Sequence, residues 1–380
     1  MKNVYSPLLC IESSAAWEPA FLLATFSSMS HPQRSVGMHH CCSLIGRNYA
    51  MRLFLGGLSA FEYWNEVRLG RMPQPRPSRI TSLRSCARRE DDILAFSRRL
   101  ALRRLSRPLD VLVTPGSSNH QSAFAQRQRT SIDLPKGSFC TIDDDIAIAS
   151  PELCFLHLSR HLTLPEAVLF AYELHGDYCL LLDRDDRLEN CRPLVSRQDL
   201  ARFLDLCKDA KGAKQARKAV RYALDHARSP MEAKVAFLLS ASSTVGGFGI
   251  RQPELNREMA ISLPNGRCQV RSCDLLWQDK NLAIEYDSSS HHEELSDIDR
   301  DARRRNQLVL NGLTVLTVTR RQVRDFAYLE GLAGDIGRLL GDRQRCRIPD
   351  IRLRRWKLHH ALFSSSNSPL RSLHNARRHP

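Results

Sequence analysis

The order of helix and strand signals between Ser229 and Leu340 constrains the fold of this chain more than any other feature. The run Ser229-Pro230-Met231-Glu232 has the residues of a capping box with proline in the first helical turn, and an apolar stripe follows it. Strand-like stretches then occupy 259–263, 269–277 and 282–287, followed by a charged helix at 296–310, a strand at 313–319 and a helix at 322–340. This order predicts an α/β domain, in which a mixed sheet is flanked by helices.

The 380 residues are enough for about two or three domains. Residues 1–50 lack periodicity and predict a poorly ordered leader. Residues 51–228 predict an accessory region that is mainly α-helical with short strands. We expect the α/β domain at 229–342, and a basic, disordered tail at 343–380.

The formal net charge is +15, and two segments account for it. Residues 68–107 hold twelve arginines against three acidic residues, and residues 343–380 hold nine arginines and one lysine against Asp350. Two basic segments on a near-neutral body suit a polyanionic partner such as DNA. The alternative is a solubilising face and a solvated tail.

Cysteine spacing and hydropathy point to the compartment. The twelve cysteines are scattered without a CxxC pair, which argues against a zinc site or a disulfide framework and favours reduced thiols in a cytoplasm. No window reaches the roughly 18 apolar residues that a membrane span needs, so we expect no membrane partner.

Carboxylates interrupt two of the apolar strands. Asp274 lies in the run CDLLW and Glu285 in the run LAIEYD, with Asp287 two positions further and therefore on the same strand face. If the two strands form a hairpin, the three carboxylates converge and need a hard cation, for which Mg²⁺ is the usual occupant. Such an ion can activate a water and stabilise charge on a phosphodiester. Glu232 could add a fourth carboxylate.

Each of these residues also has a plainer interpretation. Glu232 can be only the acid of the capping box. Asp274 and Glu285 can be strand-end residues that face water, although a carboxylate among apolar residues is unfavourable unless it is paired or metal-bound. His291 and His292 follow in the next loop, where one could act as a general base or donate to a phosphate, or both could be surface histidines.

The charged helix carries Asp301, Arg304, Leu308 and Gly312 at spacings that place them on one face. Leu308 should pack on the sheet while Arg304 points towards the carboxylates. An arginine there can fix a carboxylate or hold a phosphate. The alternative is a surface ion pair with Asp301.

Taken in order, the capping box, CDLLW, AIEYDSSSHH, the helix of Arg304 and LTVLTVT resemble the very-short-patch-repair-like branch of the PD-(D/E)XK nucleases, over about residues 229–340. The resemblance implies a restriction-endonuclease-like fold and Mg²⁺-dependent DNA cleavage. In the mechanism that we expect from these residues, Asp274 and Glu285 bind the metal, and Arg303, Arg304 and His291 contact DNA. The catalytic residues that the resemblance implies are Glu232, Asp274, Glu285, Asp287 and His292.

The chain departs from the family pattern at three positions. Asp287 stands where the wider superfamily has lysine, Ser288 stands where the family has glycine, and the single histidine is doubled. Residues 105–228 faintly resemble the region that precedes this nuclease in proteins with an AbiEi-type antitoxin arrangement.

The leading hypothesis is a metal-dependent DNA endonuclease of defence or repair. A DNA-binding, antitoxin-like regulator that uses the nuclease fold as a scaffold is the main alternative, and a nuclease acting on RNA is a third. The sequence leaves open whether the chain binds a partner protein or forms a homodimer.

Overall fold

The computed structural model describes residues 51–99, 102–117, 121–130, 133–181, 187–263, 266–287, 295–342, 348–364 and 368–378. All of them belong to one compact unit, Tyr49–Pro380. The expected leader at 1–50 lies outside the described residues.

The first part of this unit is a six-stranded sheet with the order β2-β5-β6-β1-β3-β4. Strand β1 is parallel to β6 and antiparallel to β3, so the sheet is mixed. The strands are β1 (Leu53–Leu55), β2 (Arg76–Pro77), β3 (Leu109–Val113), β4 (Ala125–Arg129), β5 (Phe139–Thr141) and β6 (Ile146–Ala149). The region thus contains the expected helices and short strands, but the strands join into one six-stranded sheet, which the local sequence signals did not predict.

Helices follow, and several begin at residues whose side chains cap them. The side chain of Ser150 accepts a hydrogen bond from the Leu153 amide at the start of α3, and Thr163 and Glu166 form a full capping box at the start of α4. A two-stranded hairpin of β7 (Tyr178–Leu181) and β8 (Arg187–Asn190) comes after α4. The helices of this region are α1 (Gly57–Arg68), α2 (Glu90–Ser97), α3 (Pro151–Ser159), α4 (Leu164–His175), α5 (Arg197–Leu206) and α6 (Ala213–Val220).

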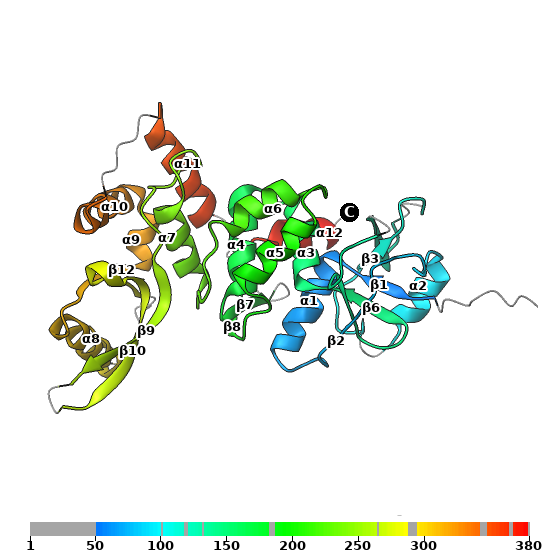
Figure 1. Cartoon of the computed structure of the whole chain (residues 1–380), viewed down its shortest axis with the longest axis horizontal. Helices are drawn as coiled ribbons and strands as arrows, with labels where there is room; N and C mark the ends of the chain where they lie inside the picture. Colours follow the sequence, from blue (N-terminus) through cyan, green and yellow to red (C-terminus); the bar gives the residue numbers. More distant parts are fainter. Residues whose placement is uncertain are drawn as a thin grey trace, which may run out of the picture. The chain divides into compact units, whose positions relative to one another are not determined.

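The second sheet has four strands in the order β12-β11-β10-β9 (Figure 1). Only β11 and β12 are parallel, and α8 connects them; the other pairs are antiparallel. This mixed sheet with flanking helices confirms the predicted α/β class. Its elements are α7 (Pro230–Ser240), β9 (Glu254–Ser262), β10 (Cys268–Trp277), the 3-10 turn η2 (Gln278–Lys280), β11 (Leu282–Asp287), α8 (Leu295–Leu310), β12 (Thr314–Thr319), α9 (Arg320–Arg324) and α10 (Phe326–Leu340).

Two apolar clusters hold this sheet. Leu275, Leu282 and Ile284 join the main core, which also contains the apolar residues of α7. Leu308 of α8, completely buried, belongs to a smaller cluster with strand residues such as Leu276 and Ala283. Leu308 therefore packs on the sheet as predicted.

The basic tail contains two helices, α11 (Ile351–Phe363) and α12 (Arg371–Arg378). Helix α11 contacts α7, and the two lie side by side in Figure 1. Leu358 and Leu362 of α11 are buried. This differs from the expected disordered tail, because two leucines one turn apart give an otherwise basic helix an apolar contact with the core.

Among the residues that the structure describes, no helix combines the length and the apolar character needed to cross a membrane.

Candidate active site

The second sheet forks between β10 and β11. Strand β10 pairs with β9 along most of its length, but with β11 only from Trp277↔Leu282 to Leu275↔Ile284. Strand β11 meanwhile stays paired with β12 up to its last residue. Asp274 and Glu285 are the first residues beyond the last paired positions, so both predicted metal ligands lie at the fork.

The side chain of Asp274 connects β10 to β11 beyond the last paired residues. Its Oδ2 atom accepts a hydrogen bond of 2.7 Å from the backbone amide of Tyr286. Burial raises the pKa of Asp274, while this hydrogen bond and the charges of Arg304 and Arg228 lower it. Asp274 also lines a pocket of about 420 Å³ together with Glu232 at the start of α7.

Glu285 forms an ion pair with α8. The Nη2 atom of Arg304 lies 3.1 Å from Glu285 Oε2 and donates to the Ser272 carbonyl at 2.8 Å. Burial, and then the charge of Asp274, raise the pKa of Glu285 to about 7 despite the nearby arginine. Glu285 Oε1 is buried, and a hydrogen bond from the Cys273 thiol to this carboxylate lowers its pKa in part.

The two carboxylates therefore approach the fork from different sides. Glu285 points to α8, like Ala283 two positions earlier, which packs with Leu308. Asp274 borders the pocket near α7. Asp274 and Glu285 lie on adjacent strands as predicted, but their carboxylates lie on different sides of the fork, which differs from the expected convergence on one cation.

Glu232 keeps its capping role and also reaches the site. The Ser229 hydroxyl accepts from the Glu232 amide, as in a capping box, but the carboxylate accepts from the backbone amide of Arg228 rather than that of Ser229. Ser229 Oγ donates to Oε1 at 2.8 Å. Burial, and then the charge of Asp274, raise the pKa of Glu232. Asp274 is thus coupled electrostatically to both glutamates.

Asn256 is a site residue that the sequence analysis missed. Its Nδ2 atom donates to Glu232 Oε2 at 2.6 Å and to the His226 carbonyl at 2.8 Å. Asn256 lies on β9 opposite Asp274, because its neighbours Leu255 and Arg257 pair with Leu275 and Cys273. Its φ is +49°. Asparagine tolerates this left-handed conformation better than most residues, but that tolerance alone does not signal a site.

The other predicted residues are only partly placed. Asp287 is half-buried at the end of β11, and Arg303 is exposed on α8. Of the two roles considered for Arg304, the structure shows the fixing of a carboxylate. His291 and His292 lie outside the described residues.

The described residues contain no group of three or more His, Cys, Asp or Glu arranged to hold a metal ion. The pair Asp274 and Glu285 nevertheless fits a hard cation in its chemistry. Both carboxyl groups have raised pKa values, which shows that nearby positive charge does not offset the burial of their negative charge. The buried Glu285 Oε1 is an oxygen of the type that Mg²⁺ prefers.

Part of the first basic segment is used inside the fold. The Arg68 guanidinium donates to the carbonyls of Glu173, Gly176, Tyr178 and Arg192. Arg99 forms ion pairs with Asp143 and Asp145. These arginines stabilise loops of the accessory region, so only the exposed members of the segment remain for a polyanion.

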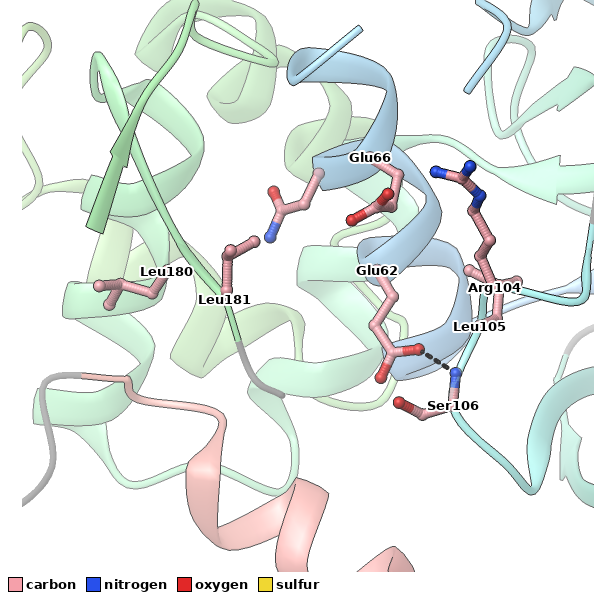
Figure 2. Close-up of a pocket in the computed structure, with 8 residues that line it drawn as sticks. Glu62, Glu66, Arg104, Leu105, Ser106, Leu180 and Leu181 are labelled. Carbon is pink, nitrogen blue, oxygen red and sulfur yellow. Dashed lines mark hydrogen bonds between the residues drawn. The ribbon is translucent and has the colours of Figure 1, made fainter. Parts of the chain in front are cut away.

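A second pocket, of about 70 Å³, lies beside α1 (Figure 2). Glu62 Oε2 accepts a hydrogen bond of 2.9 Å from the Ser106 amide there, and Leu180 points away from Glu62. The volume is well below the roughly 300 Å³ of small-molecule sites. We therefore assign no function to this pocket.

Comparison of the chain with family models, with curated proteins and with solved structures finds no match.

Proposed function

We propose that this chain is a Mg²⁺-dependent endonuclease that hydrolyses phosphodiester bonds of DNA, with a restriction-endonuclease-like domain at residues 229–342. The observation that carries the proposal is the fork between β10 and β11. Asp274 stands at its base, and its charge raises the pKa of Glu232 on one side and of Glu285 on the other. Three partly desolvated carboxylates around one fork are expected at a functional site rather than in an inert core.

In this proposal Asp274 and Glu285 hold the ion, with Glu232 as a further carboxylate. When bound, Mg²⁺ supplies positive charge for the phosphodiester and lowers the pKa of water. The Tyr286 amide orients Asp274, and Ser229 and Asn256 orient Glu232. His292 keeps its proposed role as a base.

We propose different roles for Arg304 and Arg303 of α8. Arg304 balances part of the charge of Glu285 and competes with the cation for Oε2, and the Cys273 thiol hydrogen-bonds the same carboxylate. Arg303, exposed on the same helix, is proposed to contact the DNA backbone, as is His291.

The competing function is a DNA-binding regulator without cleavage. Two features favour it: Arg304 already pairs with Glu285, and the carboxylate of Glu232 already accepts three hydrogen bonds. The ion pair and the hydrogen bonds would satisfy these carboxylates equally well if their role were structural and they bound no metal.

Purified protein with supercoiled plasmid DNA separates the two functions. We expect nicking with Mg²⁺ and none with EDTA, and loss of nicking in Asp274→Asn. Glu258→Gln, which removes an exposed carboxylate from β9, is the matched control and should cut normally. DNA binding without nicking under any metal condition would instead support the regulator.

A further inference from the structure

The pocket next to Asp274 has walls of three different kinds. Leu180, Leu188 and Met231 form an apolar side, Arg320 and Arg324 a cationic side, and Glu232 and Asp274 an acidic floor. Its volume of about 420 Å³ lies within the range of small-molecule sites. A ligand that fits it must have one apolar part and one anionic part.

The apolar wall is built into the β7–β8 hairpin. Leu180 and Leu188 face each other directly in the strand register, so their side chains are neighbours: Leu180 belongs to the buried core, and Leu188 presents the apolar surface. The backbone amide of Leu180 donates to Glu173 Oε1 of α4 at 2.9 Å, which fixes the hairpin. Leu188 is 42% exposed, so part of its side chain is accessible to a ligand in the pocket.

The cationic wall comes from α9. Arg320 and Arg324 are four residues apart and therefore lie on one helical face. Both are exposed, and neither forms an ion pair with another described residue. Both lie close enough to Tyr286, which also lines the pocket, to act electrostatically on its hydroxyl.

We propose that this pocket receives one unpaired nucleotide of DNA next to the scissile phosphate. The base packs against Leu188, Met231 and Tyr286, and its phosphate lies against Arg320 and Arg324. This inference rests on the proposed nuclease function.

The geometry selects an unpaired nucleotide over a paired one. In a duplex both flat faces of each base are covered by stacking, so a protein surface reaches only base edges, sugar and phosphate. The apolar side of the pocket therefore makes no contact with the flat face of a base in a duplex substrate. A base outside the stack, in a bulge, mismatch or single-stranded end, presents the face that this wall can cover.

The test uses two duplexes that differ only in whether one 2-aminopurine is paired or lies in a one-nucleotide bulge. Binding is followed in Ca²⁺ by 2-aminopurine fluorescence and by anisotropy. We expect the bulged duplex to bind about tenfold more tightly, the scale of one base stacked on protein side chains. Leu188→Ser should remove most of this preference, and Arg324→Gln should weaken both duplexes alike.

Leu206→Ser is the matched control, because Leu206 is a 71% exposed leucine of α5 outside the pocket, and it should leave the preference unchanged. Equal binding of the two duplexes, or an unchanged preference in Leu188→Ser, overturns the inference. Tighter binding of a single-stranded RNA of the same sequence overturns it as well.

Plasmid nicking separates this inference from the proposed function. Selective binding of the bulge without any cleavage in Mg²⁺ contradicts the nuclease and keeps the pocket as an unpaired-nucleotide site. Equal cleavage of paired and bulged duplexes keeps the nuclease and rejects the pocket assignment.

Discussion

Replacement of Glu285 by glutamine should stabilise the metal-free protein, and more so at high pH. The pKa of this carboxyl group is raised from 4.5 to about 7 in the fold, mainly by burial. Its side chain is 17% exposed. The folded state therefore binds more protons than the unfolded state between these two pKa values, so stability is lost as the pH rises through this window.

A shift of this size corresponds to about 3 kcal/mol once the group is ionised in both states. Glutamine resembles the protonated form and can still accept from Arg304. The advantage of Glu285→Gln over the natural chain should therefore be below about 1 kcal/mol at pH 5 and should approach about 3 kcal/mol at pH 8.

Urea denaturation in EDTA, followed by tryptophan fluorescence at pH 5 and pH 8, measures this difference. Glu258→Gln, at an exposed carboxylate of β9, controls for the loss of one charge and should show a small effect at both pH values. A Glu285→Gln protein that is less stable than the natural chain at pH 8 would refute the reasoning, since the ion pair with Arg304 would then outweigh the burial of the charge.

Three further predictions concern other parts of the chain. Asp274→Asn should abolish nicking, melt at or above the natural temperature in EDTA and gain less from Mg²⁺; a variant that is less stable yet still cuts contradicts the catalytic assignment. The double variant Arg354→Gln with Lys357→Gln removes two exposed charges of α11. The slope of log binding constant against log salt concentration should then become shallower by about one unit per lost phosphate contact. An unchanged slope would mean that the tail only keeps the protein soluble. Burial lowers the pKa of His157 to about 3, so the stability of the fold should decrease as the pH drops from 6.5 towards 3. Urea titrations of His157→Gln should show a weaker dependence of stability on pH in this range, and an unchanged dependence would contradict a role of His157 in acid unfolding.

The second sheet could be predicted from the sequence because its signals are local. The cap at Ser229, the strands that carry Asp274 and Glu285, and the helix face of Leu308 all follow from residue type and spacing within one element. The adjacency of the two carboxylates followed from the short turn between their strands.

The rest depends on pairings between distant segments. The six-stranded sheet joins strands of two to five residues, of which β1 pairs with β3 and β6 far along the chain. Glu285 lies on the same side as Ala283, as alternation along β11 predicts, whereas Asp274 lies on the other side from Leu276, two positions later on β10, and no spacing records this change. Asn256 and Leu188 belong to the site only because other elements pack beside them.

The basic tail has a consequence for biosynthesis. His374 of α12 lies 3.8 Å from Glu62 of α1, and α11 packs on α7. A chain emerging from the ribosome cannot close these contacts until the tail has left the exit tunnel. Until then α7 lacks its neighbour α11, and the nascent protein presents apolar surface to chaperones or to other nascent chains.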